Sequence, residues 1–243
     1  MTSTTHHFSG SNLSPGWLTP GSQQVVLPRA ALHVSASRRF LDVAASTLML
    51  ALCLPVLAVA ALLIYVTDPG PVLFRQTRLG EGGRPFTVYK LRTMRRVAGG
   101  PAVTASHDAR ITRVGAVLRR LSVDELPQLW HVLRGQMTLV GPRPESQDLA
   151  DRYPISCRPV LQARPGLTGP TQLYYREASA VPPRGWPDVE SWYLSVLVPL
   201  RTQADLEYLI RPTLANTLRY LALTALFVVG LADLQRPVEP PQA

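Results

Sequence analysis

The chain has 243 residues, which is enough for one core of ordinary size, and a formal net charge of +9. Its two cysteines, Cys53 and Cys157, lie far apart, so a disulfide framework is not expected. This use of cysteine fits a reducing compartment. One long apolar run argues against an ordinary soluble protein without membrane contact.

Residues 1–37 are rich in serine, threonine, glycine, proline and histidine and show neither helical nor strand periodicity. This composition predicts a disordered N-terminal tail.

A membrane-associated helix is predicted over residues 38–67. Val43 to Val66 is a run of 24 residues without a charge, beyond the roughly 18 apolar residues that favour a membrane segment. Pro55 near its middle predicts a kink or a break, because proline removes a helical hydrogen bond. Basic residues flank both ends, so both ends favour the cytoplasmic side. A re-entrant helix broken at Pro55 satisfies both flanks, and a straight span that tolerates the proline is the alternative.

The positive charge is concentrated directly after this segment. Eleven basic and two acidic residues lie between Arg75 and Arg120, and they account for the whole net charge. Such a stretch suits anionic lipid, a phosphate-bearing substrate or nucleic acid, and a simple positive-inside flank is the alternative. Nucleic acid is not expected, because no nucleic-acid-binding module is recognisable and aromatic residues are not interleaved with the basic ones.

The rest of the chain alternates turns, strands and helices. After the turn sequence at 68–71, residues 72–79 and 86–94 read as a small β-hairpin joined by GEGGRP. An amphipathic helix is predicted over 110–121, a short helix from Ser122 to just before Gly135, and further helices around 203–232. The apolar run from Leu221 to Ala232 is too short for a second crossing, which favours an interfacial or core helix.

Two adjacent carboxylates, Asp124 and Glu125, open the predicted helix at Ser122. Ser122 and Glu125 fit a capping box, so a purely structural role is one interpretation. The positive end of a helix would also favour an ionised Asp124, and the helical wheel places Asp124 opposite the apolar stripe, where it need not be buried.

The surroundings of the pair suggest phosphoryl chemistry. An aspartate is able to attack phosphorus as a nucleophile, and Mg²⁺ binds one or two carboxylates together with substrate phosphates. Arg119 and Arg143 are suitable ligands for phosphate oxygens.

Several segments together resemble the bacterial sugar transferases, the small monotopic polyprenyl-phosphate phosphoglycosyl transferases. These segments occur in the order DPGPVLFRQTRLG, PFTVYKLRTM, ITRVGAVLRRLSVDELPQLWHVLRGQMTLVGPRPE and RPGLTG, after the apolar run. The resemblance implies transfer of a phosphosugar from a nucleotide diphosphosugar, usually a UDP-sugar, to undecaprenyl phosphate, with release of UMP. It implies that this step starts a lipid-linked glycan or exopolysaccharide.

The resemblance also implies roles for residues. Asp124 would be the nucleophile that forms a covalent phosphosugar intermediate, Glu125 would bind Mg²⁺, and phosphate would be bound by Arg119, Arg143 and Arg176. The sequence departs from the family after RPGLTG, where Pro170 replaces a common tryptophan and Tyr174-Tyr175 precedes Arg176, so the identity of the donor is open.

The expected fold is α+β and mostly helical, in a monotopic protein on the cytoplasmic face of the bacterial inner membrane. The expected parts are the tail 1–37, the re-entrant membrane helix 38–67 broken at Pro55, the cytoplasmic catalytic domain 68–202, amphipathic interfacial helices in 203–232, and the tail 233–243. The chain is expected to be the catalytic core alone. Two alternatives remain: a non-catalytic membrane-anchored binding protein, and a lipid phosphatase that passes the intermediate to water.

Overall fold

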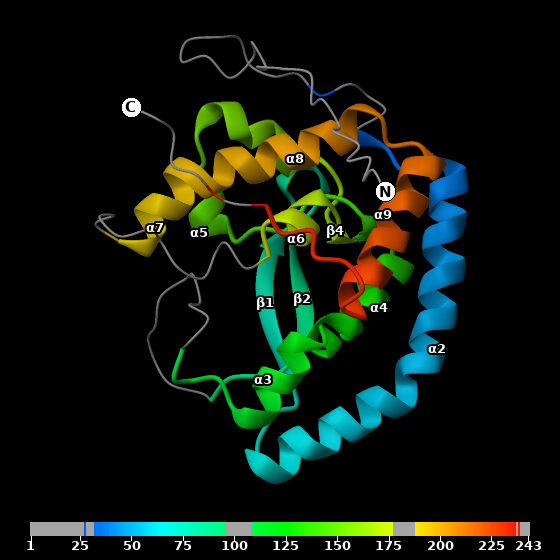
Figure 1. Cartoon of the computed structure of the whole chain (residues 1–243), viewed down its shortest axis with the longest axis vertical. Coiled ribbons are helices and arrows are strands. Elements are labelled where there is room, and N and C mark those ends of the chain that lie inside the picture. Colours follow the sequence, from blue (N-terminus) through cyan, green and yellow to red (C-terminus); the bar gives the residue numbers. More distant parts are fainter. Residues whose placement is uncertain (1–26, 28–31, 96–107, 177–187, 237, 239–243) are drawn as a thin grey trace, which may run out of the picture.

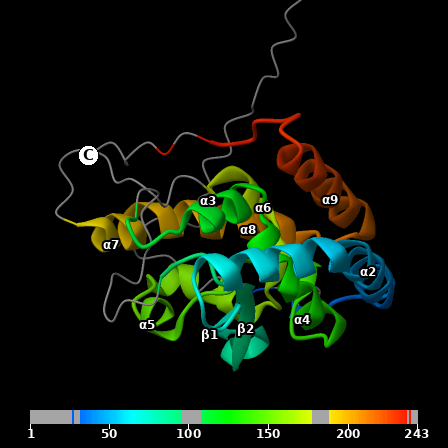
Figure 2. The same ribbon diagram turned by 90° about the horizontal axis from the view of Figure 1, so that it is seen from below.

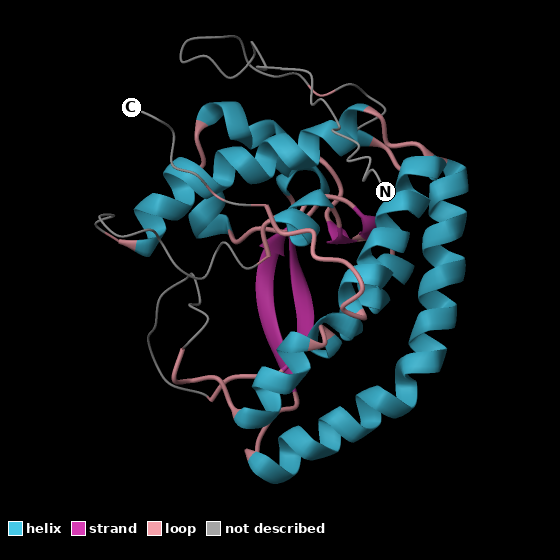
Figure 3. Ribbon diagram, viewed as in Figure 1, coloured by secondary structure: helices cyan, strands magenta, loops and turns pink. Residues whose placement is uncertain are grey.

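The computed structural model describes residues 27, 32–95, 108–176, 188–236 and 238. Most of the predicted tails, 1–37 and 233–243, therefore lies outside the described residues. In the described part, helices surround two very small sheets (Figures 1 and 3). This agrees with the prediction of a mostly helical α+β fold.

The first long helix, α2 (Ala36–Thr67), contains the apolar run and is the one described helix long and apolar enough to cross a membrane. Ser35 caps its N-terminus by accepting a hydrogen bond from the backbone N–H of Arg38 (3.4 Å). The helical assignment continues through Pro55, and the ribbon changes direction partway along its length (Figure 1). Helix α2 is thus bent and continuous through Pro55, and the re-entrant path stays a prediction.

The beginning of α2 is fixed to the rest of the protein by buried polar contacts. Asp42 is fully buried and accepts hydrogen bonds from Thr138 Oγ1 (2.8 Å) and from the backbone N–H of Leu139 (3.0 Å). Arg39 donates to the carbonyls of Val132 and Leu133, both at 2.6 Å. The helix is therefore docked by its first turns. Farther along, large apolar side chains are exposed, among them Leu52, Leu54, Val59, Leu62 and Val66.

The predicted hairpin is present. Strands β1 (Leu73–Leu79) and β2 (Pro85–Leu91) pair antiparallel across a 3₁₀ turn, η1 (Glu81–Gly83). The second strand ends at Leu91, three residues before the predicted end. A second sheet, which the sequence did not reveal, pairs β3 (Thr138–Val140) and β4 (Gly166–Thr168) in parallel.

The helical segments of the middle of the chain are short. They are α3 (Arg113–Arg120), the 3₁₀ helix η2 (Val123–Gln128), α4 (Leu129–Leu133), α5 (Gln147–Ala150), the 3₁₀ helix η3 (Ile155–Gln162) and α6 (Pro170–Tyr174). The C-terminal part consists of α7 (Val189–Trp192), a π-helical turn η5 (Tyr193–Leu197), α8 (Val198–Ile210) and α9 (Leu214–Val228).

The main core combines side chains of α4, β3 and the C-terminal helices, and its fully buried side chains include Leu129, Met137, Trp192, Leu197 and Tyr208. A smaller cluster joins the second half of α2 to the hairpin and α3 through Ala60, Ile64, Leu91 and Leu118. In Figures 1 and 2, α9 packs beside the first half of α2. Several apolar side chains of α9 are exposed: Leu214, Leu218, Leu226 and Val228.

Candidate active site

The turn that carries the two carboxylates differs from the predicted capping box. Helix α3 ends at Arg120, and Ser122 has a left-handed backbone conformation with φ 58°. A 3₁₀ helix follows, and Ser122 makes no capping hydrogen bond with its side chain. The capping-box interpretation is therefore wrong, because the backbone at Ser122 does not enter an α-helix. The Ser122 hydroxyl instead accepts a hydrogen bond from Arg176 (2.8 Å).

Glu125 lies between two cations that come from distant parts of the chain. Its Oε1 atom lies 2.7 Å from Lys90 Nζ, on β2, and 3.2 Å from Arg143 Nη2, in the loop after β3. Burial by itself raises the pKa of a carboxyl group. The charges and hydrogen bonds of Lys90 and Arg143 nevertheless hold the pKa of Glu125 well below its usual range. Glu125 is therefore ionised.

Asp124 is buried, although the helical wheel left it free to be exposed. Only 8% of the surface of Asp124 is exposed. Burial, followed by the neighbouring charge of Glu125, raises the pKa of Asp124, while Lys90, Arg119 and Arg143 act in the opposite direction. No α-helix starts at Ser122, so the helix N-terminus expected to favour an ionised Asp124 is absent, and the charges of Lys90, Arg119 and Arg143 favour the ionised form instead.

Two of the three predicted phosphate-binding arginines have side chains near the carboxylates. Arg143 bonds Glu125 directly, and Arg119 contributes a positive charge that stabilises ionised Asp124. The Nε atom of Arg119 donates to Thr93 Oγ1 (2.8 Å), which fixes the side chain against the end of the hairpin. The cluster of Asp124, Glu125, Lys90, Arg119 and Arg143 has more positive than negative charges, so it suits an anionic substrate.

The third predicted arginine, Arg176, lies in the turn after α6. Its Nη1 donates to Ser122 Oγ, and its Nη2 donates to the carbonyl of Arg119 (2.6 Å). Its guanidinium group thus bonds the hydroxyl and the backbone of the segment that precedes Asp124.

The prediction from sequence missed Lys90 and Arg78, which line a small cavity together with Arg143, Gln128 and backbone of β4. A signal for Lys90 was available. It falls on the same strand face as Phe86 and Val88, so the hairpin pattern points a lysine toward the interior. The burial of Lys90 lowers its pKa, and Glu125 opposes that change.

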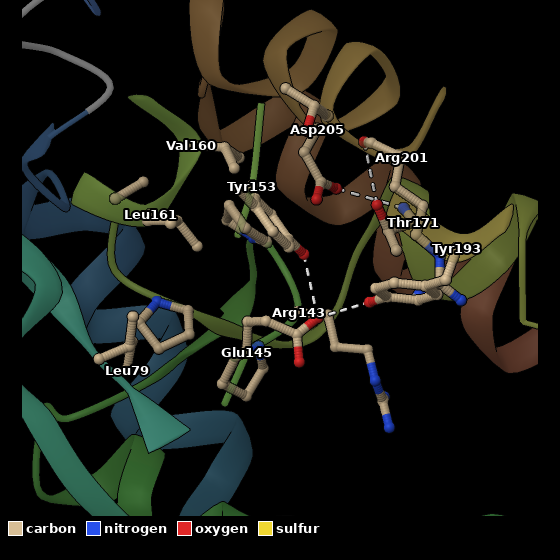
Figure 4. Close-up of a pocket in the computed structure, with 15 residues that line it drawn as sticks. Leu79, Arg143, Glu145, Tyr153, Val160, Leu161, Thr171, Tyr193, Arg201 and Asp205 are labelled. Carbon is tan, nitrogen blue, oxygen red and sulfur yellow. Dashed lines mark hydrogen bonds between the residues drawn. The ribbon is translucent and has the colours of Figure 1, made fainter. Parts of the chain in front are cut away.

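A second cavity shares Arg143 and Pro144 with the first. Figure 4 shows the hydroxyl groups of Tyr153 and Tyr193 converging on Glu145 in its lining. Both donate to Glu145 Oε2, at 3.0 and 2.5 Å, and Arg78 Nη1 lies 2.9 Å from Oε1. Burial, followed by the charge of Glu145, raises the pKa of Tyr193 to about 12, and the same two causes raise the pKa of Tyr153. Both tyrosine hydroxyl groups therefore stay protonated and donate to Glu145. Glu145 therefore ties β1 to the C-terminal helices, directly beside Arg143.

Mg²⁺ is the metal ion that the sequence leads us to expect at this site. Among the described residues, no group of three or more histidine, cysteine, aspartate or glutamate side chains is placed to hold a metal. Mg²⁺ commonly takes only one or two carboxylates and completes its shell with substrate phosphates and water. Glu125 fits that mode as a single carboxylate ligand, in which the ion binds together with an anionic substrate.

Comparisons with known proteins agree with the resemblance seen in the motifs. The model of the bacterial sugar transferase family matches residues 33–230. The UDP-glucose:undecaprenyl-phosphate glucose-1-phosphate transferase of Caulobacter vibrioides is 50% identical over 161 residues, which are 64% of this chain and 58% of that protein. A putative undecaprenyl-phosphate N-acetylgalactosaminyl 1-phosphate transferase of Bacillus subtilis is 42% identical over 120 residues, 49% of this chain and 67% of that protein.

The exopolysaccharide production protein PSS of Rhizobium leguminosarum bv. phaseoli is 42% identical over 149 residues, which are 56% of this chain and 72% of that protein. The match to the Caulobacter protein spans 58% of that protein, which is less than two thirds of its length. The family model, in contrast, covers most of this chain and includes α2, the hairpin, the carboxylate pair and both C-terminal helices. The chain belongs to the bacterial sugar transferase family.

Proposed function

We propose that the chain is a phosphoglycosyl transferase that moves a phosphosugar from a UDP-sugar to undecaprenyl phosphate. The observation that carries the proposal is the pairing of Glu125 with Lys90 and Arg143, directly beside Asp124. This arrangement offers a nucleophile and a net positive surface for a diphosphate in one place. Of the relatives, the Caulobacter protein is named for transfer from UDP-glucose to undecaprenyl phosphate, and the Bacillus protein for transfer of an N-acetylgalactosaminyl phosphate to undecaprenyl phosphate.

In the first step, a carboxylate oxygen of Asp124 attacks the phosphorus that carries the sugar. The bond from this phosphorus to the bridging oxygen breaks, and UMP leaves with that oxygen and its electron pair. Arg119, Arg143 and Lys90 stabilise the charge on the phosphate oxygens. Mg²⁺, held by Glu125 and the substrate, would neutralise further charge on the diphosphate.

In the second step, a phosphate oxygen of undecaprenyl phosphate attacks the same phosphorus. The acyl–phosphate bond to Asp124 breaks, the carboxylate is restored, and the product is a polyprenyl diphosphate sugar. Because the charged acceptor lies at a membrane surface, we place the apolar face of α2 in the cytoplasmic leaflet, as a re-entrant helix with both ends on the cytoplasmic side. Arg38 and Arg39 in the first turn of α2, together with the basic residues that follow the helix, support this placement.

The decisive test uses Asp124→Asn in the full chain, with Asp148→Asn, an exposed carboxylate, as the matched control. Wild type and the Asp148 variant should release UMP from one of a panel of UDP-sugars, and Asp124→Asn should lose at least about 1,000-fold of this rate while it remains in the membrane fraction. A fully active Asp124→Asn variant would contradict the proposal.

A second measurement separates the acceptors. With UDP-sugar and no lipid, acid-quenched wild type should carry one phosphosugar by intact mass and release at most one equivalent of UMP. Continued UMP release without lipid, with free sugar phosphate as product, would identify water as the acceptor and hence a phosphatase.

A further inference from the structure

The residue two positions before Asp124 has a backbone conformation that its side chain disfavours. Ser122 is the one non-glycine residue with positive φ in the described ranges. For a residue with a Cβ, the left-handed region costs about 1–2 kcal/mol, and such conformations persist only where the surroundings hold them. The direction in which the chain leaves Ser122 determines where Asp124 and Glu125 lie.

Arg176 supplies contacts that hold this turn. Its guanidinium group donates to Ser122 Oγ at 2.8 Å and to the carbonyl of Arg119 at 2.6 Å. The same carbonyl accepts a hydrogen bond from the backbone N–H of Ser122 (3.1 Å), at the end of α3. A cation at this negative end of a helix is favourable, and the planar fork of arginine bonds both groups at once.

Arg176 also contacts an aromatic ring of the last helix. Its Cζ lies 5.9 Å from the centre of the Phe227 ring, on α9. Arg176 thus connects α6 and α9 to the turn at Ser122, between the end of α3 and the start of η2.

We propose that Arg176 is a positioning residue, which keeps Ser122 in the left-handed conformation and thereby places Asp124 for attack. This role differs from the direct phosphate contact expected from the sequence, and it rests on the proposed function of Asp124. A phosphate ligand would act through its own charge on substrate binding. A positioning residue acts on the rate of the chemical step.

The experiment compares kcat and KM for the UDP-sugar in the full chain, for Arg176→Gln, Ser122→Gly and the double variant. Arg113→Gln, an exposed arginine of α3, is the control for loss of one charge. Arg176→Gln should lower kcat about 10- to 100-fold, because a displacement of about 1 Å is enough for such a loss, with KM changed less than about twofold. Adding Ser122→Gly should restore kcat at least about fivefold, since glycine adopts φ near 60° without the steric penalty.

Amide exchange of residues 121–125, followed by mass spectrometry, tests the same inference without catalysis. Exchange should be faster in Arg176→Gln than in Arg113→Gln. If wild type acts on no UDP-sugar, the proposed function fails, and this exchange still decides whether Arg176 holds the turn. Unchanged exchange overturns the inference. So does an Arg176→Gln variant that raises KM, keeps kcat and gains nothing from Ser122→Gly.

Discussion

The Nζ atom of Lys90 lies 2.7 Å from Oε1 of Glu125, although the two residues are 35 positions apart in the chain. This contact joins strand β2 to the 3₁₀ helix that carries the carboxylate pair. Arg143 bonds the same oxygen, so Glu125 connects the hairpin, the 3₁₀ helix and the loop after β3. Removing one member of such a cluster leaves the others with uncompensated charge.

We expect Lys90→Met to impair catalysis, because the substitution removes the cation. Methionine retains an unbranched side chain, so the packing of β2 should be preserved. The pKa of Glu125 should rise, and the initial rate of UMP release should fall about 10- to 100-fold, as phosphate charge loses one stabilising partner. Arg84→Gln, in the exposed turn of the hairpin, is the control and should stay within about twofold of wild type. Equal rates for Lys90→Met and wild type would exclude Lys90 from the site.

Asp205 should make the stability of the protein depend on pH. It is buried in α8 and accepts a hydrogen bond from the backbone N–H of Thr171 at 3.2 Å. Burial raises its pKa from 3.8 to about 7, against the opposing effects of Thr171 and Arg201. Between these values the folded chain binds the proton more tightly than the unfolded chain. The stability from this group is therefore complete below pH 3.8 and is lost as the pH rises through about 7.

Asp205→Asn is neutral at every pH and preserves an acceptor oxygen for Thr171. Melting temperatures from about pH 5 to pH 8 should fall more steeply for wild type than for this variant. In a chain of this size, each kcal/mol lost from the free energy of unfolding lowers the melting temperature by roughly 2–4 °C. Asp148→Asn should follow the wild-type curve. Parallel curves for wild type and Asp205→Asn would show that Asp205 is ionised throughout.

Gly115→Ala should destabilise the protein, although it lies inside a helix. Helix propensity alone favours alanine by about 1 kcal/mol. A Cβ at Gly115, however, would lie 2.1 Å from the carbonyl oxygen of Thr93, so α3 would have to move away from the hairpin. Because Arg119 bonds Thr93 Oγ1, this movement should also lower activity about 10-fold or more. Thermal melts and UMP release should both decrease, whereas Ala116→Gly should lose about 1 kcal/mol of stability and remain active.

A re-entrant α2 predicts that both of its ends are on the cytoplasmic side. Ser37→Cys and Thr67→Cys, each in a chain whose Cys53 and Cys157 are replaced by alanine, place one thiol at either end. A membrane-impermeant maleimide should label neither position in spheroplasts and both in inverted vesicles. Labelling of one position from each side would show a straight span instead.

A few positions show how far the sequence was informative. The hairpin was predicted because strand-like residues flank a glycine-rich turn, and both features are local. The antiparallel register confirms it. The parallel pair β3 and β4 was missed because each strand has three residues and the two lie far apart in the chain. Single-segment periodicity carries no signal for such a pairing.

The sequence by itself determined the elements whose cause is local: the long apolar helix, its proline, the hairpin and the ordered set of motifs that marks the family. Only the tertiary structure decided how these elements act on the carboxylates. It buried Asp124, paired Glu125 with Lys90 and Arg143, and placed Arg176 against Ser122. The physical reason is that burial and charge are properties of what surrounds a group. For these side chains, the surroundings come from segments far apart in the chain.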